Sequence, residues 1–358
     1  MSAVLDAGNS SKPRLTSLSH GGGCGCKIAP GVLSNLLKTK IPFDLPEQLL
    51  VGTETADDAA VYQINETQAL IATTDFFMPI VDNPRHFGQI AATNAISDIY
   101  AMGGQPIMAL AIVGMPINVL PHEDIAEILD GGREICARAG IPVAGGHSID
   151  SVEPIYGLAV IGIINPKNLK KNSTAKAGDV FILGKPLGVG IYSAALKKEK
   201  LNAEGYEQMI ANTTQLNTPG KVLAEMSAVH AITDVTGFGL LGHALEICKG
   251  SDVQGHINYS NLKILPNVKE LAEQGCITGA SGRNWTSYGA HVQLSGNLSS
   301  VDQAILTDPQ TSGGLLVACE PTAVDQVLAV FAQEGFASAA VIGQLSEKTE
   351  QDTYLTVA

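Results

Sequence analysis

The run from Phe87 to Met102 constrains the fold of this chain most strongly. Within it, apolar residues such as Ile90 and Ala91 recur at three- and four-residue steps, the spacing that brings side chains to one face of an α-helix. Asn94 and Asp98 share this spacing, so they are predicted to lie one above the other. A polar pair on a mostly apolar helix fits either an exposed face or an inward-facing ligand site, and periodicity alone leaves both open.

Strand-like runs alternate with helical patterns around this helix. The run that begins at Ala69 predicts a buried strand ending at Asp75. Apolar residues at helical spacing from Glu123 to Ala139 predict a second helix, with Cys136 in the core and Gly140 as its stop. The alternation indicates a mixed α and β architecture.

A glycine pair follows the next strand-like run. Gly145-Gly146-His147-Ser148 predicts a tight turn that carries an imidazole and a hydroxyl. Its backbone N–H groups would suit an anion-binding nest, whereas the simpler interpretation is an ordinary turn with a surface histidine.

The chain is long enough for two domains. Its 358 residues exceed what one core usually supports. The polar, turn-rich stretch 165–173 predicts the boundary, giving an arm over 1–48, an N-terminal domain over 49–170 and a C-terminal domain over 171–358. We expect residues 1–19 to be mobile. The fold class is α+β, and in the second domain we expect strands at 180–183, 256–260, 314–318 and 340–343, and helices near 190–198, 220–230 and 323–333.

Composition excludes several classes of protein. Hydrophobic residues make up 45% and charged residues 16%, which is typical of a globular protein with large cores. A formal charge of −13 argues against nucleic-acid binding. No apolar stretch is long enough for a membrane span. The six cysteines are mostly far apart and no secretory signal opens the chain, so we expect a reducing cytosol.

The segment Ser19-His20-Gly21-Gly22-Gly23-Cys24-Gly25-Cys26-Lys27 carries the strongest sign of chemistry. It puts two thiols and an amine within four residues, in a glycine-rich backbone that lets a ligand approach closely. A nearby lysine favours the thiolate, which is the nucleophilic form of cysteine. Two alternatives remain open, namely half of a zinc site and a plain flexible linker.

Aspartates gather next to predicted turns. Asp57 and Asp58 precede a strand-like run, and Asp234 ends another just before a glycine-rich turn. Residues 237–242 contain G-x-G-x-x-G, but the following strand lacks the acidic residue that holds a ribose, so a dinucleotide site is not indicated. An acidic protein that handles nucleotides needs a metal ion between its carboxylates and the phosphates.

Seven sequence blocks, taken in order, resemble the selenophosphate synthetase family. They are His20–Lys27, Asp57–Ala60, Thr73–Phe77, Ala92–Asp98, Ala144–Ser148, Thr233–Gly239 and Asp308–Gly314. The resemblance runs along nearly the whole chain. The later blocks are shared more loosely with the wider superfamily of aminoimidazole ribonucleotide synthetase, where the Cys-Gly-Cys-Lys segment is not expected.

The resemblance implies that ATP, hydrogen selenide and water yield selenophosphate, AMP and orthophosphate. It implies a cytoplasmic homodimer whose N-terminal sheets pair into a shared β-barrel, with no membrane or nucleic-acid partner. Cys24 matches the catalytic position and Lys27 the lysine that contacts ATP phosphate. Mg²⁺ is expected on Asp58, Asp98 and Asp234, together with a monovalent cation such as K⁺ and a selenium-delivering protein. The implied nucleotide contacts are Lys27, Thr55, Ala56, Asp57, Asp75, Asp98, Gly146, His147 and Ser148.

Two other functions stand beside this one. The chain would be a non-catalytic selenium or metal carrier that uses Cys24 and Cys26, although a carrier has no need of magnesium carboxylates. It would otherwise be another ATP-dependent synthetase of the same superfamily that acts on an organic substrate.

Overall fold

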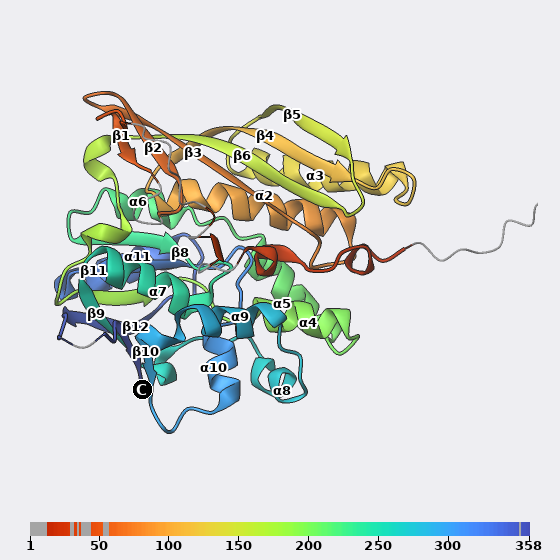
Figure 1. Cartoon of the computed structure of the whole chain (residues 1–358). Coiled ribbons are helices and arrows are strands. Elements are labelled where there is room, and N and C mark those ends of the chain that lie inside the picture. Colours follow the sequence, from red (N-terminus) through yellow and green to blue (C-terminus); the bar gives the residue numbers. More distant parts are fainter. Residues whose placement is uncertain (1–12, 29–31, 34–35, 37–43, 53–56, 351) are drawn as a thin grey trace, which may run out of the picture.

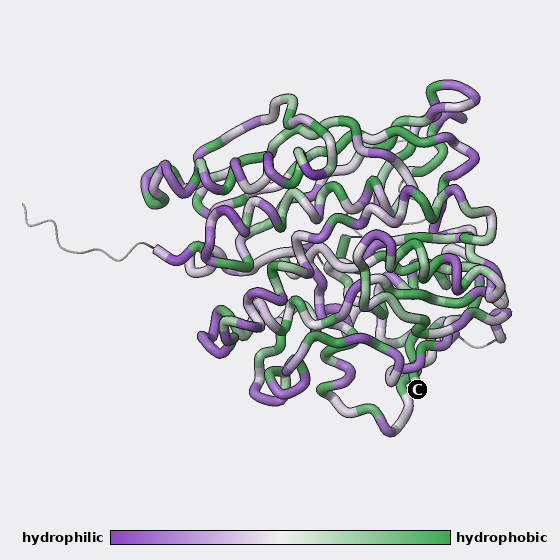
Figure 2. Tube along the Cα trace, turned by 180° about the vertical axis from the view of Figure 1, so that it is seen from behind, coloured by the Kyte–Doolittle hydropathy of each residue, from purple (hydrophilic) through white to green (hydrophobic). Residues whose placement is uncertain are grey.

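The computed structural model describes residues 13–28, 32–33, 36, 44–52, 57–350 and 352–358. Two β-sheets, each with helices packed on it, form the two halves of the molecule (Figure 1). Both halves mix strands and helices, which confirms the predicted α+β class with two mixed domains. In Figure 2 hydrophobic stretches of the chain run through both halves of the molecule, as expected for segments that pack in a core.

The N-terminal sheet has six strands in the order β1-β2-β3-β6-β4-β5. Neighbouring strands are antiparallel except β4 and β5, which are parallel and joined through a helix. The strands are β1 (Leu49–Val51), β2 (Ala60–Asn65), β3 (Gln68–Phe77), β4 (Gln105–Met115), β5 (Val143–Asp150) and β6 (Ile155–Ile164).

Helices α2 (Pro84–Ala101) and α3 (His122–Arg138) cover one face of this sheet (Figure 1). The side chain of Asn83 caps α2 by accepting the His86 N–H, and Pro84 takes the first helical position. The two helices pack closely, since a Cβ on Gly88 would lie 1.9 Å from the carbonyl oxygen of Ile128 in α3. α2 is buried almost all round because the second domain covers its other side. Asn94 and Asp98 therefore face inward.

The opposite face of the N-terminal sheet is open in this chain (Figure 1). Large apolar side chains that are at least 38% exposed project from its strands, namely Tyr62, Ile64, Phe76, Ile107, Leu110, Ile149 and Ile163. A contiguous apolar face of this kind is typical of a protein–protein interface.

The C-terminal sheet has seven strands in the order β10-β13-β9-β12-β7-β11-β8. Its strands are β7 (Val180–Leu183), β8 (Val229–Asp234), β9 (Val253–Ile257), β10 (Val292–Leu294), β11 (Leu315–Cys319), β12 (Ala340–Glu347) and β13 (Leu355–Val357). The helices around it are α4 (Val189–Lys197), α5 (Ala203–Thr213), α6 (Pro219–Ala224), α7 (Gly239–Gly250), α8 (Val268–Glu273), α9 (Gly279–Tyr288), α10 (Ser300–Leu306) and α11 (Val324–Gln333).

The prediction of a tight turn at Gly145–Ser148 is wrong. These residues lie inside the edge strand β5, in register with β4, and are exposed. Position 146 requires glycine because the backbones of β4 and β5 approach closely there, and not because the chain turns. A Cβ at this position would lie 2.1 Å from the carbonyl oxygen of Ala111. A strand does not curl its N–H groups around an anion, so the anion nest that was weighed against an ordinary turn is absent from this segment as well.

The predicted helix over residues 220–230 is only half correct. Helix α6 ends at Ala224, and β8 begins at Val229 with all six of its residues buried. A short apolar run that is buried on both faces has no clear period, so sequence alone does not separate strand from helix there. The strand expected at 256–260 is β9, which lies three residues earlier.

The segment from Arg14 to Lys27 runs between the two halves (Figure 1). Arg14 bonds Asp82 of the first half and Glu199 of the second, each at 2.8 Å. Thr16 donates to Asp82 from both its amide and its hydroxyl. Arg14 and Thr16 thus connect the described start of the expected arm to both halves of the molecule. Residues 1–12 lie outside the described residues.

Candidate active site

Three carboxylates from distant parts of the sequence meet between the two halves. Asp58 precedes β2, Asp98 lies on α2 and Asp234 ends β8, and one ligand oxygen of each lies within 4.8 Å of the others. Burial raises the pKa of all three, and the charge of Asp234 raises those of Asp58 and Asp98 further. Such a cluster is unfavourable until a cation neutralises it.

The hydrogen bonds of this cluster leave room for a ligand. Thr233 Oγ1 donates to Asp58 Oδ1 at 2.8 Å, and Thr73 Oγ1 donates to Asp98 Oδ2. Asp58 Oδ2 and Asp234 Oδ2 are buried without a partner among the described residues. Buried carboxylate oxygens without donors fit a hard divalent cation such as Mg²⁺, which prefers oxygen ligands.

Cys24 is buried beside this cluster, on the short helical turn Gly23–Cys26. Its thiol donates to Asn94 Oδ1 at 3.1 Å, and its backbone N–H donates to Thr311 Oγ1 at 3.1 Å. Asn94 also accepts the Ser312 N–H at 2.7 Å and donates to Asp75 through its amide nitrogen. Helix α2 therefore holds the sulfur of Cys24, and the turn at 308–314 holds its backbone.

The expectation that Lys27 favours the Cys24 thiolate does not hold in this state. Burial raises the pKa of Cys24 well above its usual value, and the negative charge of Asp75 raises it further. Lys27 lowers the pKa but does not outweigh these effects, because its ammonium lies at 3.4 Å from Asp75 and is shared with that carboxylate. Cys24 is accordingly a thiol that donates to Asn94.

This protonation state predicts slow alkylation of Cys24 in the ligand-free protein. We expect little reaction with iodoacetamide at pH 7–9, since the thiolate is the reactive form and the pKa lies well above 9.0. Cys26, whose pKa burial raises to about 11, is the internal reference. Peptide mass spectrometry measures both rates, and rapid labelling of Cys24 at pH 7 would contradict the assignment.

Lys27 completes the polar wall of the site. Loss of water around the ammonium opposes its charge, but Asp75 foremost, together with Asp98 and Asp234, outweighs this cost and raises the pKa of Lys27, so it is an ammonium. A cavity of about 350 Å³ opens beside it, with walls that include Cys24, Cys26, Lys27, Asp75 and Phe76. The arrangement places a cation and a thiol at one opening.

Among the described residues, the other expected nucleotide contacts lie outside this group within one chain. Asp57 Oδ1 accepts the Asn172 N–H at 2.6 Å, at the junction of the two halves. Gly146, His147 and Ser148 lie on β5, separated from β3 and Asp75 by β6 and β4. Thr55 and Ala56 lie outside the described residues.

Comparison with known proteins shows the family to which the chain belongs. The family models described as AIR synthase related protein, N-terminal domain and C-terminal domain match residues 56–164 and 176–355. A selenide, water dikinase of Pseudomonas straminea is 68% identical over 334 residues, which are 93% of this chain and 94% of the relative. The chain belongs to the selenide, water dikinase family. The family's member from Dechloromonas aromatica is 64% identical, over 94% of this chain and 97% of the relative.

More distant solved structures share the fold alone. A thiamine-monophosphate kinase from Stenotrophomonas maltophilia has a TM-score of 0.63 at 18% identity and covers 87% of this chain, which covers 91% of it. The hydrogenase maturation protein HypE of E. coli has a TM-score of 0.61 at 20% identity, with coverage of 82% and 83%. The superfamily architecture is therefore common to this dikinase family member and to proteins with other names.

Some contacts of the site were missed from the sequence. Asn94 was paired with Asp98 but given no role, although its helical spacing was a usable signal. Thr311 lies in the Asp308–Gly314 block of the resemblance but was given no role, because no local pattern relates it to Cys24, 287 positions away in the sequence. Ser97 was also overlooked; it hydrogen bonds Asp234 and accepts from Asn217 Nδ2 at 2.7 Å.

Proposed function

We propose that this chain makes selenophosphate from ATP, hydrogen selenide and water, releasing AMP and orthophosphate. The observation that carries the proposal is the position of Cys24 and Lys27 beside the buried carboxylates of Asp58, Asp98 and Asp234. Membership of the selenide, water dikinase family supports the choice of substrates. A carrier needs the thiols but not the carboxylates, so catalysis explains more of the site.

Asp58, Asp98 and Asp234 would hold Mg²⁺, which when bound neutralises charge on the phosphate oxygens of ATP. The unpartnered oxygens of Asp58 and Asp234 fit that ligand. Lys27 adds a fixed positive charge where charge develops during phosphoryl transfer. Asp75 holds the Lys27 ammonium in place at 3.4 Å.

In the proposed reaction Cys24 orients or delivers selenide. The Cys24 sulfur is buried and donates to Asn94, and Thr311 holds the Cys24 backbone, so a selenide in the adjoining cavity would meet the sulfur in a defined geometry. The Cys24 thiol donates its hydrogen to the Asn94 amide oxygen. Cys26 lines the same cavity and is the next thiol a selenide would meet.

We also propose a homodimer, formed through the open face of the N-terminal sheet. The exposed apolar residues on β2, β3, β4 and β6 supply the contact, and pairing would close the sheets into a barrel. Gly146, His147 and Ser148 at the β5 edge would then contact nucleotide at the interface, since they do not reach the carboxylates of their own chain. Dimerisation would thus be a condition for a complete ATP site.

Replacing Leu110 by Glu is expected to convert the dimer into monomers, because it puts a charge on the open sheet face. Light scattering after size exclusion measures the molar mass. Val222→Glu is the control, as Val222 is also an exposed apolar residue but lies on α6. A wild-type protein that is already a monomer at micromolar concentration would refute the proposed dimer.

The test of the reaction is phosphorus NMR under anaerobic conditions with ATP, Mg²⁺ and selenide. We expect a phosphorus resonance coupled to selenium together with AMP. An ATPase assay with and without selenide separates the alternatives, since a carrier consumes no ATP and a synthetase for an organic substrate is indifferent to selenide. Formation of ADP without a selenium-coupled resonance would reject selenophosphate synthesis.

Several finer proposals follow from the family and the cysteines. All six cysteines are free, which supports work in the reducing cytoplasm, and no described helix is long and apolar enough to cross a membrane. A monovalent cation such as K⁺ and a selenium-delivering protein rest on family resemblance alone. The proposed division into an arm over 1–48 and domains over 49–170 and 171–358 is supported by one sheet within each domain.

A further inference from the structure

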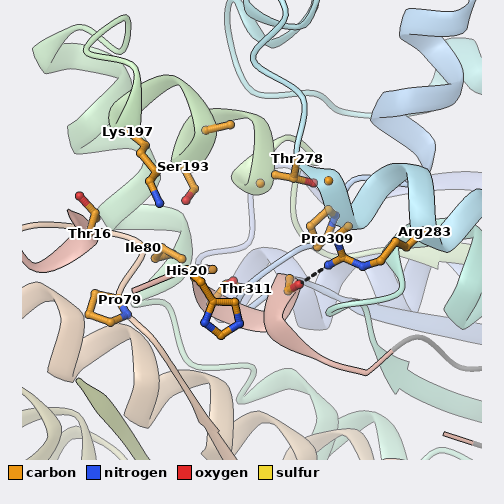
Figure 3. A pocket seen from close by; sticks show the side chains of 17 residues that line it. Thr16, His20, Pro79, Ile80, Ser193, Lys197, Thr278, Arg283, Pro309 and Thr311 are labelled. Atoms are coloured by element: carbon orange, nitrogen blue, oxygen red, sulfur yellow. Dashed lines mark hydrogen bonds between the residues drawn. The ribbon is translucent and has the colours of Figure 1, made fainter. Parts of the chain in front are cut away.

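A second cavity lies on the other side of the segment that carries Cys24. Its volume is about 270 Å³, and it is enclosed by the arm, the loop after β3, and helices α4 and α9 (Figure 3). Polar side chains in its wall are Thr16, His20, Ser193, Lys197, Thr278, Arg283 and Thr311. In Figure 3 Lys197 and Arg283 enter from opposite sides, one from α4 and one from α9.

The charge of this cavity is opposite to that of the chain. No Asp or Glu is among its lining residues, whereas the whole sequence has a formal charge of −13. Lys197 and Arg283 form no ion pair with a described residue; Lys197 donates to the Ser19 carbonyl at 3.4 Å and Arg283 to the Gly25 carbonyl at 3.1 Å. Among the other lining side chains, His20 pairs with Glu153 and the Thr16 hydroxyl donates to Asp82. Two uncompensated cations therefore face one space.

Backbone donors add to these cations. The first residues of α9, Gly279 and Ala280, line the cavity, and their N–H groups have no acceptor among the described residues. The start of α4 is different, because Asp308 already accepts the N–H groups of Gly190 and Ile191. α9 thus offers the free amides. Arg283 lies over the same turn, since its Nη1 would be 3.3 Å from a Cβ placed on Gly279.

Size and chemistry together select the ligand. The cavity is smaller than the roughly 300–1,000 Å³ typical of sites for drug-sized molecules, and no Phe, Tyr or Trp lines it to stack on a base. Fixed cations, hydroxyl groups and free amides suit a compact anion with several acceptor oxygens. We propose that this cavity binds a small tetrahedral oxyanion of the phosphate class.

The cavity shares a wall with the active site. Thr311 lines it, and the Thr311 hydroxyl also accepts the backbone N–H of Cys24. Arg283 holds the carbonyl of Gly25, the next residue. An anion bound between Lys197 and Arg283 would therefore hold the segment 21–25 against the second domain. The site itself does not rest on the proposed reaction, although the orthophosphate released there belongs to this class of ligand.

Titration calorimetry of the full chain with inorganic phosphate tests the site. EDTA keeps metal ions away, and chloride keeps the ionic strength constant; without metal, the carboxylate cluster repels phosphate. We expect saturable binding of one phosphate per chain with a Kd of about 1 mM or lower. Arg283→Gln and Lys197→Gln should each weaken binding by about tenfold or more, because each removes a charge-assisted hydrogen bond.

Lys198→Gln is the matched control. Lys198 follows Lys197 on the chain and is exposed, but it does not line the cavity and its ammonium donates to the Gly275 carbonyl at 2.6 Å. Its loss should leave the Kd within about twofold. Absence of saturable binding, unchanged affinity in both cavity variants, or equal weakening by Lys198→Gln would each overturn the site. Unchanged melting temperatures would show that the exposed substitutions leave the fold intact.

The link to Cys24 has its own readout. Phosphate should slow hydrogen–deuterium exchange of the backbone amides of residues 21–25, including the Cys24 N–H that Thr311 accepts, in the wild-type chain, and should have no effect in Arg283→Gln, as measured by mass spectrometry of the peptide. The assay needs neither ATP nor selenide, so failure of the proposed reaction would not affect it. Equal slowing in both proteins would show that phosphate acts elsewhere.

Discussion

Replacing Cys24 by Ser is expected to lower selenide-dependent AMP formation by about 100-fold or more while the protein stays folded. A hydroxyl at this position keeps the geometry, since it still donates to Asn94 Oδ1 and the backbone N–H still reaches Thr311 Oγ1. The change removes only the soft, polarisable sulfur that the proposed reaction uses for selenide. Anaerobic turnover, followed as AMP by chromatography, measures the effect.

Cys26→Ser is the matched control for this substitution. Cys26 lies two residues away, on the same short helical turn, and is only partly buried. Comparable selenophosphate production by this variant would make Cys26 a spectator, whereas an equal loss in both variants would assign selenium handling to the pair. Full activity of Cys24→Ser would remove Cys24 from the mechanism.

Periodicity predicted those parts of the fold whose environment repeats along the chain. The two helices of the first domain were expected at 87–102 and 123–139, and the structure has α2 at Pro84–Ala101 and α3 at His122–Arg138. Errors arose where a residue served tertiary packing instead of local geometry. Gly146 is required by the close approach of Ala111, and β8 is a strand because both of its faces are covered.

The contacts of the candidate site likewise divide into those that local spacing predicts and those that only the tertiary structure shows. Asn94 and Asp98 share a helix face, so their proximity was predictable from spacing, and the structure adds that this face is buried. The meeting of Asp58, Asp98 and Asp234 was implied only by family resemblance, because no local rule relates a loop, a helix and a strand end. The proton on Cys24 was not predictable, since it depends on burial and on the charge of Asp75. Local patterns reveal candidates, whereas tertiary contacts decide their chemical state.

Asp98→Asn is expected to have opposite effects on stability and on activity. In EDTA the variant should be more stable than wild type by about 1 kcal/mol, because burial first, and then the charges of Asp234 and Asp75, raise the pKa of Asp98 and make its negative charge unfavourable. The amide oxygen still accepts from Thr73, so the hydrogen bond persists. The melting temperature should rise by about 2 °C or more in differential scanning calorimetry.

With Mg²⁺ and ATP the order should reverse. Wild type gains stability from the bound ligands, but Asp98→Asn should gain little, and its turnover should fall by about 100-fold or more, since metal ions contribute several kcal/mol to such reactions. Asp130→Asn is the control, because Asp130 is an exposed partner of Arg133 far from the cluster. A variant that is less stable than wild type in EDTA would mean that Asp98 is a structural residue. Undiminished Mg²⁺-dependent stabilisation would mean that the cation binds without it.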